Sequence, residues 1–159
     1  MTTSQSPQSP QPAAPPAPLD NLLLLFATAP AIWYSSVRPD GRAHLAPIWH
    51  VWDGHAAYVV TQATAVRARN LAHNRSVSLA LPDAINPFII EGNAAIAPDA
   101  METIQPLFQS KYDWDIRTDA EYDCIIRVTP TKAMAWGSHG EGRWHYDASA
   151  GLWLARGAE

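Results

Sequence analysis

The sequence predicts a small α+β domain, mainly antiparallel β, with a barrel-like sheet and short flanking helices. The chain has 159 residues, of which 47% are hydrophobic and 16% charged, and this fits one domain. From Ala31 onward it is rich in Trp, Tyr, Val and Ile, and turn signals such as Asp40-Gly41 and Asp53-Gly54 divide it into short segments. Many short strands with two inserted helices are typical of a small barrel.

Residues 1–18 are predicted to form a disordered tail. They contain six of the fourteen prolines and no charged side chain, so they cannot bury enough apolar surface to offset the entropy lost on ordering. The apolar run 22–26 follows Asp20 and has no basic residue upstream, which disfavours a signal peptide. The run is too short to span a bilayer. We therefore expect a short helix packed on the domain.

The turn signals separate the rest of the chain into antiparallel strands. Residues 123–136 are expected to be either one strand or two strands bent at Pro130. The folded domain is predicted for residues 19–147, followed by a C-terminal tail over residues 148–159. The expected strands lie near residues 31–37, 42–51, 55–61, 76–81, 87–96, 123–136 and 143–147.

Two helices are expected between the strands. Thr64 can cap a helix that runs to about His73 and buries its alanines. Asp99 and Glu102 have the spacing of a capping box and predict the start of a second helix. Pro106 should kink or end that helix, because proline lacks the backbone N–H.

Charge and cysteine content exclude several classes of protein. Fifteen acids against eleven bases leave a formal charge of -4 and a pI near 5.8, which disfavours a nucleic-acid binder. Cys124 is the single cysteine, so no intramolecular disulfide or four-thiolate zinc site can form. We expect a cytoplasmic protein without a nucleic-acid or membrane partner.

The basic residues gather in one window of the sequence. Residues 1–80 hold five bases and three acids, whereas residues 81–159 hold six bases and twelve acids. No acid lies between Asp53 and Asp83, and three of the arginines fall in that window. Arg67 would lie in the first turn of the predicted helix, where an anion could neutralise both the guanidinium and the helix dipole. From the residues alone, a solvated set of arginines is an equally good interpretation.

Several motifs, in a fixed order, resemble one known family. They include Gly41-Arg42-Ala43-His44-Leu45-Ala46-Pro47-Ile48-Trp49, Tyr58-Val59-Val60-Thr61-Gln62, Ala65-Val66-Arg67-Ala68-Arg69-Asn70-Leu71, Glu91-Gly92-Asn93-Ala94 and Val128-Thr129-Pro130-Thr131-Lys132. With Trp136, they are similar to the pyridoxamine 5'-phosphate oxidase-like flavin-binding split-barrel family over most of residues 22–147. The resemblance implies a six-stranded split β-barrel and a homodimer with two cofactor sites at the subunit interface.

The resemblance also implies a cofactor and the residues that bind it. The cofactor would be FMN or, as the alternative, 8-hydroxy-5-deazaflavin. Arg67 matches the basic residue that binds the cofactor phosphate, and Arg69 and Asn70 match positions that assist it. The remaining matched residues are Thr61 and Gln62 near the ribityl-phosphate, Pro47, Ile48 and Trp49 along the flavin ring, and Trp136, Arg143 and Trp144 near the partner's cofactor.

The departures from the family pattern narrow the expected activity. The oxidase proper grips the FMN phosphate with a Ser-Arg-Lys run, where this chain has Ala65-Val66-Arg67. The sequence VRARNL is closer to the deazaflavin branch or to members without a settled reaction, and pyridoxamine phosphate oxidation is not expected. We predict an oxidoreductase that transfers hydride or electrons to a small organic substrate, with no catalytic residue identified. A non-enzymatic flavin or haem carrier or sensor, and a cofactor-free interaction module, are the alternatives.

The other reactive residues have simpler interpretations. His44 and His50 would lie about 20 Å apart on one strand, at roughly 3.3 Å per residue, so they cannot share a metal ion. Cys124 precedes an apolar pair and is predicted to be a buried core residue rather than a nucleophile. The acidic stretch that begins at Asp113-Trp114-Asp115 is expected to be a solvated loop between a helix and a strand.

Overall fold

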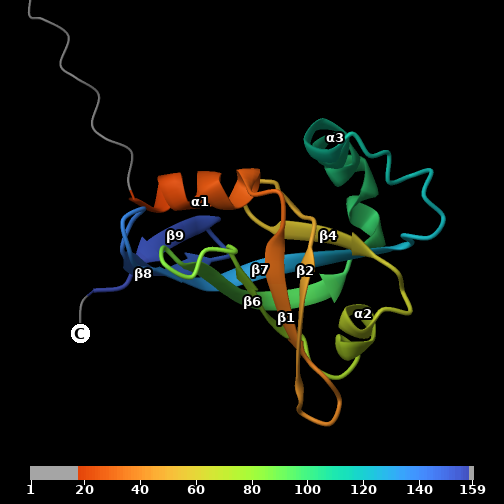
Figure 1. The fold of residues 1–159 in the computed structure, drawn as a ribbon, viewed down its shortest axis with the longest axis horizontal. Coiled ribbons are helices and arrows are strands. Elements are labelled where there is room, and N and C mark those ends of the chain that lie inside the picture. The colour runs from red at the N-terminus through yellow and green to blue at the C-terminus, as the bar shows by residue number, and fades with distance from the viewer. Residues whose placement is uncertain (1–17, 158–159) are drawn as a thin grey trace, which may run out of the picture.

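The computed structural model describes residues 18–157 and shows one antiparallel sheet flanked by helices (Figure 1). The predicted α+β class, mainly antiparallel β, is confirmed. The helices are α1 (Pro18–Thr28), α2 (Val66–Asn70) and α3 (Met101–Tyr112), and the 3-10 turn η1 (Pro98–Ala100) precedes α3. The strands are β1 (Ile32–Val37), β2 (Ala43–Ile48), β3 (Val51–Trp52), β4 (Ala57–Thr61), β5 (Ser76–Ala80), β6 (Phe88–Ile96), β7 (Cys124–Ala135), β8 (Gly142–Asp147) and β9 (Leu152–Ala155).

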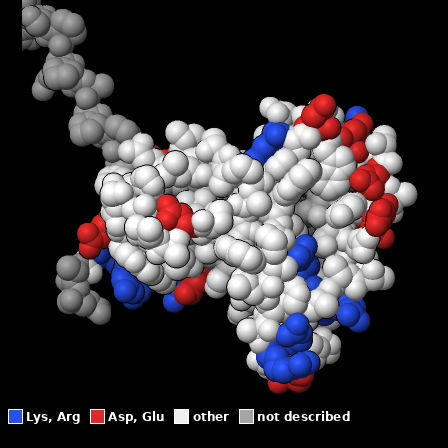
Figure 2. Space-filling view, viewed as in Figure 1, with Lys and Arg blue, Asp and Glu red and all other residues white. Residues whose placement is uncertain are grey.

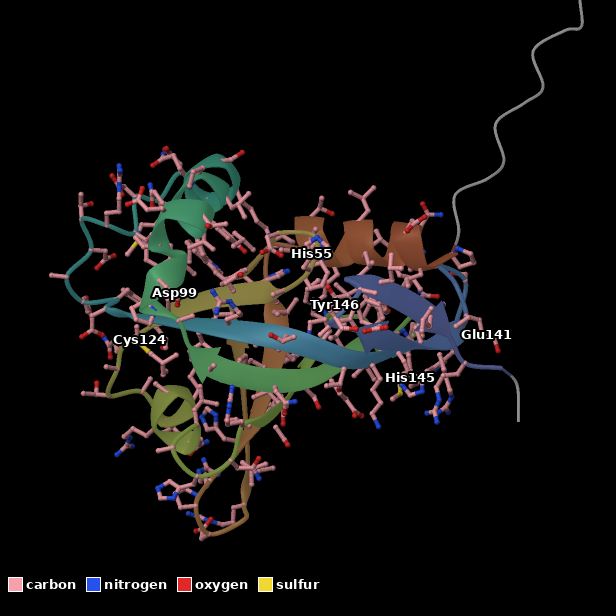
Figure 3. The ribbon with its side chains drawn as sticks, turned by 180° about the vertical axis from the view of Figure 1, so that it is seen from behind. His55, Asp99, Cys124, Glu141, His145 and Tyr146 are labelled. Carbon is pink, nitrogen blue, oxygen red and sulfur yellow. The ribbon has the colours of Figure 1, made fainter. Side chains whose placement is uncertain are left out.

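The strand order of the sheet is β2-β1-β5-β6-β7-β4-β3, and β8 and β9 extend it from β7. Within residues 18–157 the sheet therefore has nine strands, whereas the turn signals predicted seven. One reason is that the predicted strand over residues 42–51 breaks at Trp49 and His50 into β2 and β3. The other is that residues 152–155, placed in the C-terminal tail by the sequence, pair with β8 as β9. His55 Nδ1 lies 3.0 Å from Tyr146 Oη and so links the β3–β4 turn to this hairpin (Figure 3).

Strand β4 separates two hydrophobic cores. All five of its residues are buried, as expected for a strand covered on both faces. Val59 packs in the larger core with α1 and the main sheet, whereas Tyr58 and Val60 pack in a smaller core with Ile104 and Phe108 of α3. The smaller core is the reason that α3 and the segment after it lie beside the end of β4.

The expected helix α1 is confirmed: Leu22 and Phe26 are fully buried on one face, four residues apart. The predicted disordered tail lies outside the described residues, apart from Pro18, which begins α1. No helix within residues 18–157 is long and apolar enough to cross a membrane.

The two inserted helices differ in detail from the prediction. Helix α2 starts at Val66 after Ala65 and has no side-chain cap, so Thr64 does not cap it. The carboxylate of Asp99 accepts a hydrogen bond from Arg127 Nη2 at 3.1 Å instead of capping α3. Helix α3 continues six residues past Pro106, because Ile104 and Phe108 anchor both halves of it in the smaller core.

Strand β7 runs through Pro130 without ending. Pro130 lies opposite Gly92 of β6, where the register of the two strands shifts between Glu91 and Gly92. The hydroxyl of Thr131 donates to the carbonyl of Glu91 at 3.1 Å. A bulge is a place where a sheet tolerates proline, so the second of the two expected alternatives, a pair of bent strands, is wrong.

Candidate functional site

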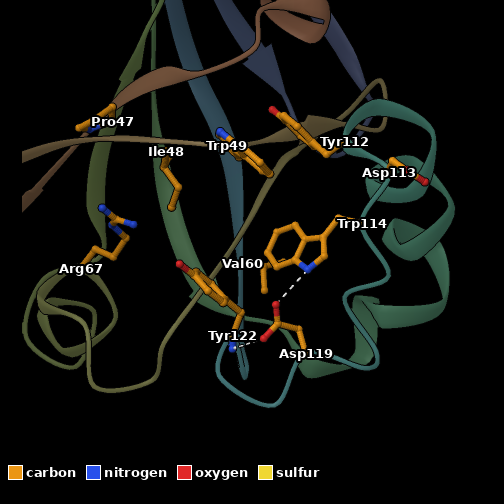
Figure 4. A pocket seen from close by; sticks show the side chains of 10 residues that line it. All are labelled: Pro47, Ile48, Trp49, Val60, Arg67, Tyr112, Asp113, Trp114, Asp119 and Tyr122. Atoms are coloured by element: carbon orange, nitrogen blue, oxygen red, sulfur yellow. Dashed lines mark hydrogen bonds between the residues drawn. The ribbon is translucent and has the colours of Figure 1, made fainter.

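A cavity of about 570 Å³ lies between the β2–β3 break, the start of α2 and the segment that follows α3 (Figure 4). Its volume is in the range of small-molecule sites. The walls are largely aromatic and aliphatic, with one basic and two acidic side chains. The lining residues are Pro47, Ile48, Trp49, Val60, Arg67, Tyr112, Asp113, Trp114, Asp119 and Tyr122.

The break between β2 and β3 forms one wall of the cavity. His50 turns into the interior, is fully buried, and donates from Nε2 to the carbonyl of Phe26 at 2.7 Å. Lys111 Nζ donates to the His50 carbonyl at 2.8 Å, and Tyr112 Oη accepts from the His50 backbone N–H at 3.0 Å. With His50 held inward, its neighbour Trp49 faces outward and stacks on Tyr112, with ring centroids 4.5 Å apart and 2° between the planes.

Arg67 lies at one end of the cavity without a charged partner. Its side chain is half-buried, and among the described residues no carboxylate forms an ion pair with it. Burial lowers the pKa of this guanidinium, because the charge loses hydration. Its Nε atom is buried and has no hydrogen-bond partner in the described part of the chain. Such a cation favours an anionic ligand that restores both the charge balance and the missing hydrogen bond.

Two further buried polar atoms near Arg67 also have no partner. They are Tyr34 Oη, in a residue with no exposed surface, and His44 Nδ1. Burial raises the pKa of Tyr34, and the positive charge of Arg67 opposes this rise. Burial lowers the pKa of His44, and the charge of Arg67 lowers it further. Buried polar groups are normally paired. Of the three residues only Arg67 lines the cavity, so its Nε is the atom that a polar ligand there could reach.

The surface around the cavity carries opposite charges on its two sides (Figure 2). Lys and Arg gather over α2 and the β1–β2 hairpin, whereas Asp and Glu gather over α3 and the segment after it. Within the cavity itself, Arg67 is at one end, and Asp113 and Asp119 are at the other (Figure 4). The site therefore combines an anion-binding end with an aromatic end that is acidic.

Comparisons with known proteins identify the family of this chain. A sequence profile of the family described as pyridoxamine 5'-phosphate oxidase matches residues 20–137. The chain belongs to the pyridoxamine 5'-phosphate oxidase-like FMN-binding split-barrel family. Among curated proteins, no sequence matches the chain.

Solved structures with the same fold include three of interest. An F420 reductase has a TM-score of 0.58 at 23% identity, covering 69% of this chain and 93% of its own. An FMN-binding protein of Nostoc punctiforme, described as pyridoxamine 5'-phosphate oxidase-related, has a TM-score of 0.62 at 12% identity, covering 92% and 100%. A heme binding protein from Mycobacterium smegmatis has a TM-score of 0.66 at 16% identity, covering 81% and 57%. At these identities the likeness concerns the fold alone.

Four of the residues matched to the pyridoxamine 5'-phosphate oxidase-like family lie together in the cavity. Pro47, Ile48 and Trp49 form its β2 edge, and Arg67 reaches it from α2. Helix α2 has only five residues, however, so the helix dipole invoked from the sequence is small, and the burial of Arg67 is what distinguishes it.

Four other matched residues surround the cavity without lining it. Thr61 is buried at the end of β4, and Gln62 Nε2 donates to Glu121 Oε1 at 2.8 Å. Arg69 is exposed on α2. Asn70, only 2% exposed, donates from Nδ2 to Ser36 Oγ at 3.0 Å and so joins α2 to β1.

The matched residues of the later strands do not line the cavity. Trp136 lines a separate apolar groove with Trp33. Arg143 lies on β8, and Trp144 is 8% exposed and packs in the larger core.

The aromatic end of the cavity was not predicted from the sequence. Residues 113–122 were expected to be solvated, yet Trp114, Asp119 and Tyr122 line the site. The available signal was a tryptophan inside an acidic segment, since a large aromatic side chain seldom lies in a loop without packing against something.

The remaining reactive residues stay outside the cavity. Cys124 is buried, as predicted, and its burial raises the pKa of the thiol. Within residues 18–157, no three His, Cys, Asp or Glu side chains are close enough to hold a metal ion.

Proposed function

We propose that this protein is a flavin-type oxidoreductase that binds FMN and transfers hydride or electrons to a small organic molecule. The observation that carries the proposal is the half-buried Arg67, which has no acidic partner within residues 18–157 and opens onto a cavity with aromatic walls. A phosphorylated, flat cofactor matches both properties, because its phosphate pairs with a guanidinium and its ring packs against apolar and aromatic surface.

Different residues of the cavity would bind different parts of the cofactor. Arg67 would hold the phosphate, and the edge formed by Pro47, Ile48 and Trp49 would lie along the ring system. The cofactor supplies the redox chemistry when bound. The chain positions it and excludes water: Trp49 is held by its stack on Tyr112, and Val60 belongs to the packed smaller core. We propose the six-stranded split barrel of the family for β1, β2, β4, β5, β6 and β7.

The 8-hydroxy-5-deazaflavin coenzyme is the second candidate cofactor. Of the three side chains with which the oxidase proper grips the FMN phosphate, this chain keeps a basic residue at the third position only, Arg67, and has Ala65 and Val66 at the other two. The F420 reductase among the similar structures supports this alternative. The two cofactors share the phosphate and the flat ring that the cavity favours, so their relative affinity decides between them.

A haem or flavin carrier without enzymatic activity is the third candidate. The heme binding protein among the similar structures favours it. The cavity offers less support, because none of its lining residues is a His, Cys or Met, and a tyrosine is the only haem ligand type present.

We further propose a homodimer with the cofactor sites at the interface. The outer face of β1 and β2 exposes Trp33 and Leu45, and Trp33 lies directly opposite Pro47, which lines the cavity. An apolar surface continuous with the rim of a site favours contact between subunits there.

Titration of the apo-protein with FMN, the deazaflavin coenzyme and haem, each followed by its absorption spectrum, tests the proposal. Tight stoichiometric binding of FMN or the deazaflavin, together with oxidation of the reduced cofactor by a panel of organic acceptors, is the expected result. Binding without turnover for every acceptor would favour the carrier. No binding of any of the three would reject the proposed function.

A further inference from the structure

The aromatic end of the cavity is organised around Trp114. Three other rings pack against its indole at nearly right angles: Phe108 at 5.6 Å and 87°, Tyr122 at 5.4 Å and 89°, and Trp49 at 6.1 Å and 79° between centroids and planes. Edge-to-face contacts of this kind are a favourable arrangement of aromatic rings. Trp114 also lines the cavity, so its position is set by packing on the protein side while part of it faces the open space (Figure 4).

Asp119 holds the indole in place. Its Oδ2 accepts a hydrogen bond from Trp114 Nε1 at 3.1 Å, and its Oδ1 accepts from the backbone N–H groups of Glu121 and Tyr122 at 3.2 and 3.4 Å. One carboxylate thereby fixes both the plane of Trp114 and the turn that carries Tyr122. A preorganised ring of this kind can stack on a ligand with little loss of side-chain entropy.

The charges near Trp114 are acidic. Asp113 and Asp119 line the cavity on either side of it, and Arg67 is the only basic residue among the described lining residues. Two bases lie near this end, and neither pairs with Asp113 or Asp119 within residues 18–157. Arg117 pairs with Asp115 at 3.0 Å, and Lys111, whose Nζ is 5.1 Å from the centroid of the Tyr112 ring, donates to the His50 carbonyl. An anion at this end would meet two carboxylates that form no ion pair within residues 18–157, and their like charge opposes its binding.

We infer that this end of the cavity binds the substrate, and that the substrate presents a planar aromatic group without negative charge that packs against Trp114. The inference rests on the proposed function, in which Arg67 and the β2 edge hold the cofactor at the other end. Asp119 is the residue that positions Trp114, and the two carboxylates exclude anionic aromatic molecules. Selection against a ligand by like charge is a common source of specificity.

Three probes with one ring system and different charges test the inference: indole, tryptamine and indole-3-acetate. Their dissociation constants are measured by ligand-observed NMR on the cofactor-loaded protein. Indole and tryptamine should bind, and indole-3-acetate should bind at least about fivefold more weakly, as expected for one like-charge contact at a partly exposed site. Equal binding of all three, or tightest binding of indole-3-acetate, would overturn the inference.

Variants assign the binding to particular residues. Trp114→Ala should weaken the binding of indole about tenfold, because the variant removes a ring contact and the apolar area that this contact buries. The control is Leu154→Ala, which removes an exposed apolar side chain from β9 and should leave indole affinity unchanged. Equal losses in both variants, or no loss in Trp114→Ala, would contradict the proposed stacking.

Asp113→Asn tests the charge alone. Asp113 has a positive φ of 52°, a conformation that asparagine adopts readily, and its Oδ1 accepts from Gln109 Nε2 at 2.9 Å, a bond that an amide oxygen can keep. The variant should reduce the difference in affinity between indole and indole-3-acetate and leave the affinity for indole unchanged. An unchanged difference would reject the role of this carboxylate.

The same samples separate this inference from the proposed function. Cofactor affinity is measured in each variant, and it should not change in Asp113→Asn. In Trp114→Ala the loss of indole affinity should exceed any loss of cofactor affinity, which can arise because Trp114 packs against Trp49. If the protein binds no cofactor, the proposed function fails, whatever the probes do. If cofactor binds and the probes do not, or if FMN displaces indole competitively from the apo-protein, the assignment of this end to the substrate fails alone.

Discussion

The guanidinium of Arg67 lies over the ring of Tyr34, with Cζ 5.9 Å from the ring centroid. Each residue has a buried polar atom without a partner, Nε in Arg67 and Oη in Tyr34. The ring stabilises the cation from one side but provides no hydrogen bond to it. The ring therefore stabilises the guanidinium in the apo-protein, while the unpaired Nε of Arg67 favours binding of a ligand.

Arg67→Ala should weaken binding of FMN or the deazaflavin by about 1.5 to 3 kcal/mol, the range for a hydrogen bond to a charged group. Stability of the apo-protein should hold or rise slightly, because the variant removes a half-buried charge without an acidic partner. Calorimetric titration measures the affinity. Arg42→Ala is the control: Arg42 is 72% exposed and pairs with Asp40 in the β1–β2 turn. Equal affinity of Arg67→Ala and the wild type would reject the phosphate assignment.

Tyr34→Phe should raise the stability of the apo-protein by about 1 kcal/mol. The change removes a buried hydroxyl that has no hydrogen-bond partner, and leaving such a group unpaired costs about 1 to 3 kcal/mol. Denaturant unfolding of the two proteins measures the difference. A loss of stability would show that a water molecule or another group already pairs with the hydroxyl.

Stability should fall as the pH is lowered from about 6.5 toward 4. Burial lowers the pKa of His50 to about 4, and Lys111 adds to the effect. The unfolded chain has a histidine pKa of about 6.5, so between these values it binds more protons than the folded protein and acid favours unfolding. The full difference is worth about 3 kcal/mol.

Unfolding in denaturant at several pH values measures this dependence. The His50→Gln variant should lose most of the slope between pH 6.5 and 5, whereas His73→Gln, an exposed histidine, should keep it. Identical slopes in the wild type and His50→Gln would show that His50 is not the group responsible.

Gly92→Ala should destabilise the protein by about 2 kcal/mol or more. A Cβ atom there would lie 2.4 Å from the backbone carbonyl oxygen of Thr129, which cannot move without disturbing the pairing of β6 and β7. Gly157→Ala, where a Cβ would meet no neighbour within 4 Å, is the control. Melting temperatures of the two variants measure the contrast, and equal values would refute the close approach.

Light scattering should give a mass of 34.8 kDa, twice the 17.4 kDa of one chain. The reason is the exposed apolar face around Trp33 and Leu45. Substituting Leu45 by Lys should shift the equilibrium toward the monomer, because it places a charge in the middle of that face. A 17.4 kDa species at micromolar concentration in the wild type would contradict the dimer.

The pattern of the sequence predicted most of the strands and the helix α1. Both signals are local: apolar residues repeat along each element, and Gly, Pro, Asn and Asp mark the turns. Arg67 could also be singled out, because an acid-free window and a family motif coincide there. The strand β9 was missed because the segment 148–159 is short and becomes a strand only by pairing with β8.

The chain's amino acids thus specify an antiparallel α+β domain of known family with a basic residue suited to a phosphate. Folding decides what surrounds that residue. Helix α3 packs on β4, more than forty residues away in the chain, and thereby brings Trp114 and Asp119 to the cavity that Arg67 enters. Whether a guanidinium is solvated or lacks a partner, and whether an acidic loop is free or forms a wall, depends on contacts between distant segments. Local sequence patterns do not predict those contacts, because burial and pairing arise only when the segments pack together.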